Sequence, residues 1–268
     1  MLRRNKTMEF PKWPLYKAAM KNKFLFSATM LFSLVSSVAA QAEVKTLILK
    51  PEAIFAPKSF DSNDNAQVVL AGAFSGYCVK MGATDFKIDT EAKKIFIRQS
   101  ASVDGACMDL DMYIPYSNVL NLGTLPKGNY TVLALQPDQS YAAMTVLPIK
   151  AANNATMSGS DERLYAPVNA LEFSARKSKE NPTLTLKGYF TNTCLEFDTI
   201  EVYQKSPEVI EVLPLAKVVN KDCKSVVKTF SKSVKISTFS GKDTLIHVRA
   251  MNGQSLNKVI TNLDWILK

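Results

Sequence analysis

Histidine is nearly absent from this chain of 268 residues, which contains one, His247. A single histidine cannot supply a metal cluster, and acid–base catalysis through it would need a nucleophile or carboxylate partner that the sequence does not place nearby. A Gly-x-Ser-x-Gly elbow and a glycine-rich phosphate loop are also missing from the sequence. The chain therefore lacks any recognisable catalytic constellation, and we expect a protein that is not an enzyme and has no cofactor.

Long apolar runs are absent after residue 38. The single uncharged apolar run, residues 24–38, follows two lysines and precedes Ala40-Gln41-Ala42, as in a secretory signal peptide. An uncleaved anchor is the alternative, but the run is short and rich in serine for a membrane span. Residues 1–42 are predicted to be a signal peptide with an N-terminal extension, starting at Met1 or Met20. We expect the mature protein to be periplasmic or extracellular and not inserted in a membrane.

A large excess of one charge is lacking once residues 1–42 are set aside. The whole chain carries 33 basic and 24 acidic side chains, but this segment holds seven of the basic ones and one acidic one, which leaves 26 and 23. Residues 151–268 hold 16 basic and 12 acidic side chains. Attraction to an anionic partner is therefore predicted for that part, and the near balance argues against a nucleic-acid partner.

Cysteine is sparse, but its four positions are regularly spaced. Cys78 and Cys107 are 29 residues apart, as are Cys194 and Cys223, and the second pair lies 116 residues after the first. An even number of cysteines in an exported chain predicts disulfides. If each copy of this spacing folds as a unit, the bridges are Cys78–Cys107 and Cys194–Cys223. A zinc site is the alternative, but it would need closely spaced Cys or His ligands.

The offset of 116 residues also aligns other positions without a gap, among them Leu70 with Leu186, Gly72 with Gly188, Phe74 with Phe190 and Val132 with Val248. A repeat of this length exceeds a solenoid unit and is close to the common size of a domain. The sequence therefore predicts a tandem repeat of two domains, residues 43–150 and residues 163–268, joined by a small, polar linker at residues 151–162.

Short stretches that alternate apolar and polar residues, separated by glycine and proline turns, recur along both domains. In the first domain the predicted strands are 46–49, 68–74, 85–89, 94–98, 109–116, 130–135 and 143–149. In the second they are 184–190, 199–203, 209–213, 226–230, 234–238, 244–250 and 258–263. About seven short strands in about 100 residues predict an all-β fold of two tandem antiparallel β-sandwich domains, each with one disulfide.

The stretch Leu125-Pro126-Lys127-Gly128-Asn129-Tyr130-Thr131-Val132, which comes after Gly72 and the first two cysteines, has the pattern Leu-x-x-Gly-x-Tyr-x-Val. It resembles the start of a late strand in immunoglobulin-like or fibronectin-like β-sandwich modules of exported bacterial proteins. The resemblance implies that the Tyr130 hydroxyl reaches the backbone. The second domain departs from the pattern, with Ile246 where Tyr130 stands. The cysteine spacing is also too short for the inter-sheet bridge of antibody domains, so each pair is expected to tie neighbouring segments.

The densest charge in the chain is a run of lysines in the second domain: Lys217, Lys221, Lys224, Lys228, Lys232 and Lys235. Several fall in predicted strands and loops, so some could converge on one sheet face and contact an anionic surface. A phosphorylated glycolipid, a cell-wall polymer or an acidic protein would offer such a surface. The alternative is a solvated strand face whose lysines prevent edge-to-edge aggregation.

His247 is predicted to be a solvated strand residue. The alternation in residues 244–250 places Ile246, Val248 and Ala250 on the core face and leaves His247 pointing outward beside Arg249.

Residues 61–65 resemble the start of a calcium loop, but Ala66 and Gly72 stand where an EF-hand requires Gly and Glu. A looser site that includes Asp104, Asp109 and Asp111 is left open. Asp109 and Asp111 would share a strand face, as paired carboxylates of glycosidases could, but such pairs are abundant in strands.

Together these features favour an exported, non-enzymatic binding or structural module that recognises a protein or glycan of the cell envelope or outside the cell. A periplasmic chaperone that donates a strand edge to its client is the main alternative, because that family is similar in size, export and tandem immunoglobulin-like architecture. Its clients' carboxyl ends bind a basic pair in the interdomain cleft, and the sequence identifies no such pair. A hydrolase is a third alternative, without an identifiable site.

Overall fold

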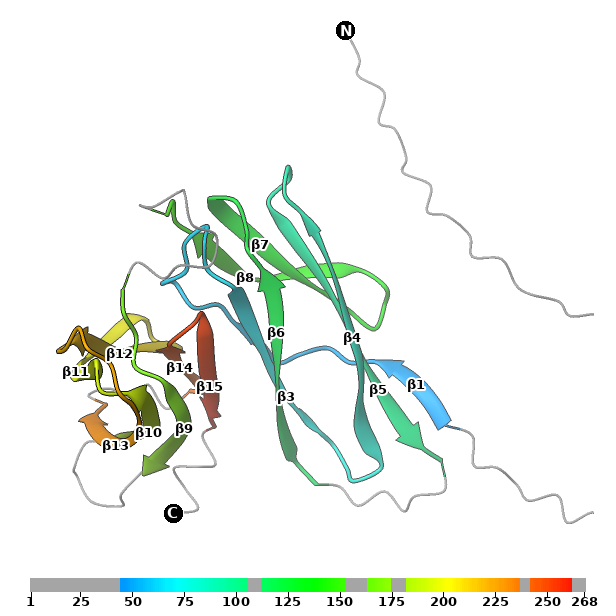
Figure 1. The fold of residues 1–268 in the computed structure, drawn as a ribbon. Coiled ribbons are helices and arrows are strands. Elements are labelled where there is room, and N and C mark those ends of the chain that lie inside the picture. The colour runs from blue at the N-terminus through cyan, green and yellow to red at the C-terminus, as the bar shows by residue number, and fades with distance from the viewer. Residues whose placement is uncertain (1–43, 106–111, 153–162, 175–181, 237–241, 262–268) are drawn as a thin grey trace, which may run out of the picture. The chain divides into compact units, whose positions relative to one another are not determined.

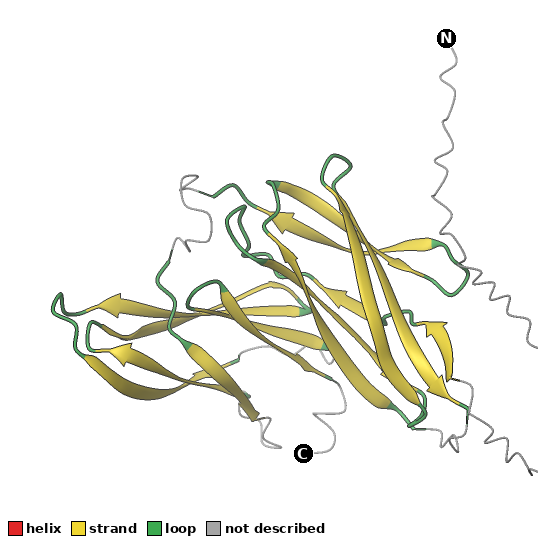
Figure 2. Cartoon of the chain, turned by 45° about the vertical axis from the view of Figure 1, so that its right-hand side comes forward, coloured by secondary structure: helices red, strands yellow, loops and turns green. Residues whose placement is uncertain are grey.

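The structure is a computed structural model that describes residues 44–105, 112–152, 163–174, 182–236 and 242–261. The described residues all belong to one compact unit, Ala42–Lys268. The predicted signal segment and most of the predicted linker lie outside the described residues. Regular structure in the described part consists of β-strands (Figure 2), which confirms the all-β prediction. No helix long and apolar enough to cross a membrane occurs there.

The first half of the described chain forms two sheets (Figure 1). Its strands are β1 (Val44–Ile48), β2 (Ala53–Phe55), β3 (Ala66–Phe74), β4 (Val79–Asp89), β5 (Lys94–Asp104), β6 (Ile114–Gly123), β7 (Gly128–Leu135) and β8 (Tyr141–Ile149). In one sheet β5 pairs with β4, β1 and β7, and β7 pairs with β8; the other sheet has the order β2-β3-β6.

Among the described residues, the second half has the same strand order without a counterpart of β1. Its strands are β9 (Val168–Ser174), β10 (Thr183–Asn192), β11 (Leu195–Ser206), β12 (Val209–Val218), β13 (Ser225–Lys235), β14 (Thr244–Ala250) and β15 (Gln254–Ile260). One sheet has the order β11-β12-β14-β15, and the other has the order β13-β10-β9. The two halves thus connect their strands in the same way.

One strand pair in each half differs from the predicted antiparallel sheets. β5 pairs with β7, and β12 pairs with β14, in the parallel sense. Parallel neighbours need a crossover connection, and the chain supplies it by passing through the other sheet, as β6 in the first half and as β13 in the second. Apolar alternation has the same period in both senses, so the sequence pattern does not reveal the direction of a pair.

Each half has its own apolar core, to which both of its sheets contribute. In the first half the core includes Leu70 of β3, Ile95 of β5 and Val132 of β7. In the second half it includes Leu186 of β10 and Val248 of β14. The predicted inward positions Ile246, Val248 and Ala250 all lie in this second core. Alternating apolar residues therefore bury the facing sides of the sheets, as the period of a strand predicts.

Tyr130 and Gly188 show how particular residues fit these sheets. Tyr130 is fully buried, and its hydroxyl donates a hydrogen bond of 2.9 Å to the carbonyl oxygen of Pro126, the contact with the backbone that the sequence motif implies. At Gly188 a Cβ atom would lie 2.1 Å from the carbonyl oxygen of Pro167. Only glycine allows so close an approach of the two backbones, at a point where the β9–β10 register shifts.

The predicted strands are found with altered limits. β2 and β9 were not predicted, and predicted strand 226–230 lies with the first two residues of predicted strand 234–238 in one continuous strand, β13. Part of predicted strand 109–116 lies outside the described residues, and the strand in that region is β6. No glycine or proline separates the two predicted strands that merge in β13, so a continuous strand needs no unusual backbone.

The two halves contact each other through outer sheet faces. One apolar cluster combines Phe55, Val69 and Ala71 of the first half with Val209 and Leu245 of the second. All seven residues of β14 and the first six of β12 are buried, although only alternate ones belong to the core of their own half. Strands β12 and β14 are therefore covered on both faces, which decides the environment of the polar residues that they carry.

Candidate functional site

The predicted lysines lie at one side of the second half. Lys228, Lys232 and Lys235 are in β13, Lys217 is in β12, and Lys221 and Lys224 lie between these strands; all six are exposed. Every residue of β13 is exposed or half-buried, so this strand offers its side chains to solvent along its whole length.

In the part of the chain that the structure describes, β13 pairs with β10 alone, which makes it an edge strand. The N–H of Ile236, directly after β13, donates to the carbonyl oxygen of Pro182, directly before β10. Backbone N–H groups alternate in direction along a strand. Even-numbered residues of β13 therefore direct their backbone groups toward β10, and odd-numbered residues, such as Thr229 and Ser231, direct theirs to the free edge.

A groove runs beside this edge, between β13 and β11, which belongs to the other sheet. It consists of two adjoining hollows of about 410 and 310 Å³. Phe197 and Lys232 line both hollows, and Phe190, Phe230 and Lys228 line the larger one. The aromatic rings pack in tilted contacts, with centroids 5.2 to 5.4 Å apart. The Lys232 ammonium lies 5.8 Å from the centre of the Phe197 ring, within the range of a cation–π contact.

Strand β11, which lines the other side of the groove, carries acidic residues that form ion pairs with one of the lysines. The Lys217 ammonium lies 3.2 Å from a Glu196 oxygen and 3.5 Å from an Asp198 oxygen. The Glu196 hydrogen bond is the main cause of a raised pKa for Lys217. No described acidic side chain forms an ion pair with Lys228 or Lys232. The structure thus brings these two lysines together in the groove and neutralises the third.

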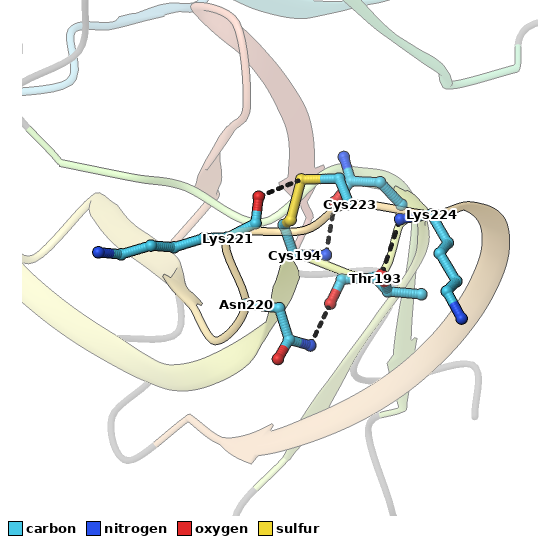
Figure 3. The surroundings of a disulfide bond; sticks show 7 residues. Thr193, Cys194, Asn220, Lys221, Cys223 and Lys224 are labelled. Carbon is cyan, nitrogen blue, oxygen red and sulfur yellow. Dashed lines mark hydrogen bonds between the residues drawn. A yellow bond between two sulfur atoms is a disulfide. The ribbon is translucent and has the colours of Figure 1, made fainter.

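A disulfide joins the starts of the two strands that line the groove. Cys194 directly precedes β11, Cys223 lies just before β13, and the two are bonded, which confirms the predicted pairing. Lys221 and Lys224 flank the bridge, and their side chains extend away from it (Figure 3). The backbone N–H of Lys224 donates to the Thr193 hydroxyl, so the two strand starts are also hydrogen-bonded. Cys78 is likewise disulfide-bonded, and its predicted partner, Cys107, lies outside the described residues.

His247 is not the solvated residue that the alternation predicts, because its side chain is fully buried. It does point away from the core of its own half, but the first half covers that face, with the Phe60 ring packed edge-on at 5.3 Å. Burial lowers the pKa of His247 to about 4, against the opposing effect of the hydrogen bond with Asn257. The imidazole is therefore neutral at physiological pH.

The hydrogen bonds around His247 determine which ring nitrogen carries its proton. The side-chain amide of Asn257 donates to Gln67 Oε1, which leaves the Asn257 Oδ1 atom facing His247 Nδ1 at 2.7 Å. That oxygen can only accept, so Nδ1 carries the proton. Nε2 is then an acceptor, and it has no hydrogen-bond partner. Gln67 belongs to β3, so this chain of contacts joins the two halves.

Glu211 lies beside His247 in the parallel pair and is also buried. Its Oε1 atom accepts hydrogen bonds from the backbone N–H groups of Lys58 and Ser59, at 2.5 and 2.8 Å. Its Oε2 atom has no partner, and neither has the hydroxyl of Ser59. Glu211 was not predicted as a site residue, although a carboxylate inside the apolar stretch 209–215 is an unusual position for an acidic residue.

A buried ion pair completes this polar contact between the halves. Arg249 binds both carboxylate oxygens of Asp64, one of them at 2.8 Å, and both side chains are at least 94% buried. The guanidinium also lies 5.1 Å from the Tyr165 ring centre and 5.4 Å from the Phe60 ring centre. Next to this pair, a cavity of about 260 Å³ is lined by Ser59, Asp61, Asp64, Lys150, Arg163, Tyr165, Tyr203, Glu211, Leu213 and Arg249.

The calcium-like residues 61–65 have another role in the structure. The backbone N–H of Asn63 donates to an Asp61 carboxylate oxygen, and that of Asp61 donates to Asp64 Oδ2. These bonds form a turn that positions Asp64 for Arg249. Asp109 and Asp111 lie outside the described residues. Within the described part of the chain, no group of three or more His, Cys, Asp or Glu side chains is placed to hold a metal ion.

No family model, curated protein or solved structure matches this chain. Two sites therefore carry the evidence on function: the groove beside β13 and the polar contact between the halves.

Proposed function

We propose that this protein is an exported, non-enzymatic binding module that captures an extended, acidic segment of a partner protein along the free edge of β13. The proposal rests on one observation: β13 is an exposed edge strand with outward backbone groups, and two lysines lie in the aromatic groove beside it. We also propose that the two halves are tandem β-sandwich domains of the immunoglobulin-like type, and that the protein works in the periplasm or outside the cell, where the Cys194–Cys223 disulfide would persist.

Backbone hydrogen bonds favour a protein partner over a glycan. An extended peptide that adds to a sheet edge gains affinity from main-chain hydrogen bonds, and its alternate side chains enter neighbouring pockets. On this proposal the outward N–H and C=O groups of Thr229 and Ser231 pair with the peptide. Every second side chain of the peptide then reaches the groove beside Phe197, and acidic ones meet Lys228 and Lys232.

A chaperone that binds the strand of a client would use the same kind of edge, so it remains the alternative. In that family a basic pair in the interdomain cleft holds the client's carboxyl end. Here Arg163 and Arg249 line the cavity between the halves, but each holds a carboxylate already, Glu201 and Asp64 respectively. The contacts of these arginines therefore favour a binding module that uses its second half.

The test is the binding of a fluorescent peptide of alternating glutamate and valine to the oxidised protein, measured by fluorescence anisotropy. A peptide of alternating lysine and valine is the control for charge. We expect the acidic peptide alone to bind, and its affinity to fall as salt screens the exposed lysines. The double variant Lys228→Glu/Lys232→Glu should bind at least about tenfold more weakly, since each exchange replaces attraction by repulsion.

Two matched controls separate charge from strand addition. Lys80→Glu/Lys87→Glu makes the same change of charge on β4, an exposed edge strand of the first half, and should leave binding unchanged. Ser231→Pro removes one outward N–H without removing a bond to β10, so it should weaken binding, whereas Ser231→Ala should not. Equal binding of both peptides, or full affinity in Ser231→Pro, would contradict capture of an acidic strand at this edge.

A further inference from the structure

The cavity between the two halves contains one anionic and one cationic group that form no ion pair with any residue in the described part of the chain. Of its six charged lining residues, Arg249 binds Asp64, and Arg163 binds Glu201 through two hydrogen bonds of 2.6 Å. Glu211 has no cation partner among the described residues, and Lys150 has no acidic one. Asp61 lies in the turn described above. The unmatched charges are therefore a buried carboxylate and an exposed ammonium on the wall of the same cavity.

The carboxylate of Glu211 is held in a fixed position. Two backbone N–H groups fix its Oε1 atom, and only 1% of the residue surface is accessible to solvent. The Oε2 atom is buried without a hydrogen-bond partner, as is the hydroxyl of Ser59, which lines the same cavity. A buried carboxylate oxygen without a partner is costly, and a charged donor compensates it best. The neighbouring His247 cannot serve, because its imidazole is neutral and its free Nε2 atom is an acceptor.

We propose that this cavity binds a small α-amino zwitterion, such as a free amino acid, whose ammonium group donates to Glu211 Oε2 and Ser59 Oγ and whose carboxylate faces Lys150. A ligand with both charges matches the two unmatched groups at once. The volume of about 260 Å³ suits such a ligand, since sites for drug-sized molecules measure about 300–1,000 Å³. This site is separate from the β13 groove, and its test does not depend on the proposed capture of a strand.

The first experiment is isothermal titration calorimetry of the oxidised protein with each of the twenty free amino acids. We expect at least one to bind with one-to-one stoichiometry. Its N-acetyl derivative, which lacks the ammonium group, and its amide, which lacks the carboxylate, should each bind about tenfold more weakly or worse. Equal binding of the amide would overturn the zwitterion and indicate a simple amine or a peptide N-terminus. Failure of all twenty to bind would overturn the inference.

Two variants assign the binding to these residues. Glu211→Gln keeps an oxygen for the Lys58 and Ser59 amides but turns an N–H donor toward the ligand, so affinity should fall about tenfold or more. Lys150→Met removes the rim charge at an exposed position, where folding is not at risk, and should also weaken binding. Lys80→Met, an exposed change on β4 in the first half, is the control and should have no effect. Unchanged affinity in both Glu211→Gln and Lys150→Met would contradict this site.

Discussion

The His247 imidazole faces a polar and aromatic surrounding from both halves. On its own sheet it adjoins Glu211 and Asn257, and across the contact it meets the Phe60 ring. Burial holds its pKa at about 4, whereas an unfolded chain would protonate it near 6.5. A proton on His247 is therefore taken up more readily by the unfolded protein than by the folded one.

We expect stability to fall as the pH is lowered from about 6.5 to about 4, because in this window the unfolded state binds a proton that the folded state does not. Above 6.5 both states are neutral and the full stability is present. Between pH 7 and pH 5 the loss should be ~2 kcal/mol, from a shift of this size at about 1.36 kcal/mol per pKa unit. Urea unfolding at a series of pH values measures it.

His247→Gln is the control for this prediction, since its side-chain amide can still donate to Asn257 and has no charge in the window. His247 is the only histidine in the chain, so the variant should lose most of the slope between pH 5 and pH 7. An equally steep slope in the variant would assign the effect to carboxylates instead.

At the scale of elements, the Cys194–Cys223 bridge joins the starts of two strands that belong to different sheets. β11 and β13 do not pair with each other, and their first residues are held together by the disulfide and by the hydrogen bonds around Thr193. The bridge spans 29 residues of sequence, a loop whose closure is worth about 3.5 kcal/mol in the chain-entropy account.

Replacing both cysteines, Cys194→Ala/Cys223→Ala, should therefore lower the free energy of unfolding by about 3.5 kcal/mol. Because the bridge holds together the starts of the two strands that line the groove, β11 and β13, the variant should also bind the acidic peptide more weakly. Urea unfolding and the anisotropy titration provide the two measurements. A loss of less than about 1 kcal/mol would mean that hydrogen bonds already hold the two strand starts together.

Strand composition and cysteine spacing were sufficient to predict the all-β class, most strands and the Cys194–Cys223 pairing. The parallel pairs β5–β7 and β12–β14 were not predictable, since alternation carries no information on strand direction. The sequence left open whether the lysines converge on one sheet face or form a solvated strand face; Lys228 and Lys232 line one groove, and their contact with an anionic partner stays a prediction. The ion pairs that neutralise Lys217 were not predicted, because only strand pairing brings Glu196 and Asp198 close to this lysine.

The burial of His247 could not be predicted from the sequence of its own strand, because a sheet of the first half covers the His247 side chain. Within residues 244–250 the alternation predicts its direction correctly, and only the presence of the first half turns an outward position into a buried one. Residues at such a contact look like surface residues in sequence. The largely apolar character of 209–215, where Glu211 is the one charged residue, was the available signal, since a strand covered on one face would show more polar positions.

At the scale of the whole molecule, the two halves are joined by an apolar cluster and by a buried polar network, and the network includes the Asp64–Arg249 pair. Breaking a buried pair by removing one partner costs about 3–5 kcal/mol, because the remaining charge is left without compensation. Replacing both partners with uncharged side chains removes that penalty. The pair therefore contributes little net stability, and its main effect is to determine the arrangement in which the two faces pack.

Asp64→Asn and Arg249→Met should each destabilise the protein by about 3–5 kcal/mol, and the double variant should be more stable than the sum of the two losses predicts. Urea unfolding of the four proteins gives this coupling energy. Because the lost contacts join the halves, we expect each single variant to unfold in two transitions where the parent unfolds in one.

Glu172→Gln, which breaks the exposed pair with Lys187, is the control and should cost less than about 1 kcal/mol. Additive losses and a single transition in every variant would instead mean that the apolar cluster of Phe55, Val69 and Leu245 holds the halves together without the ion pair.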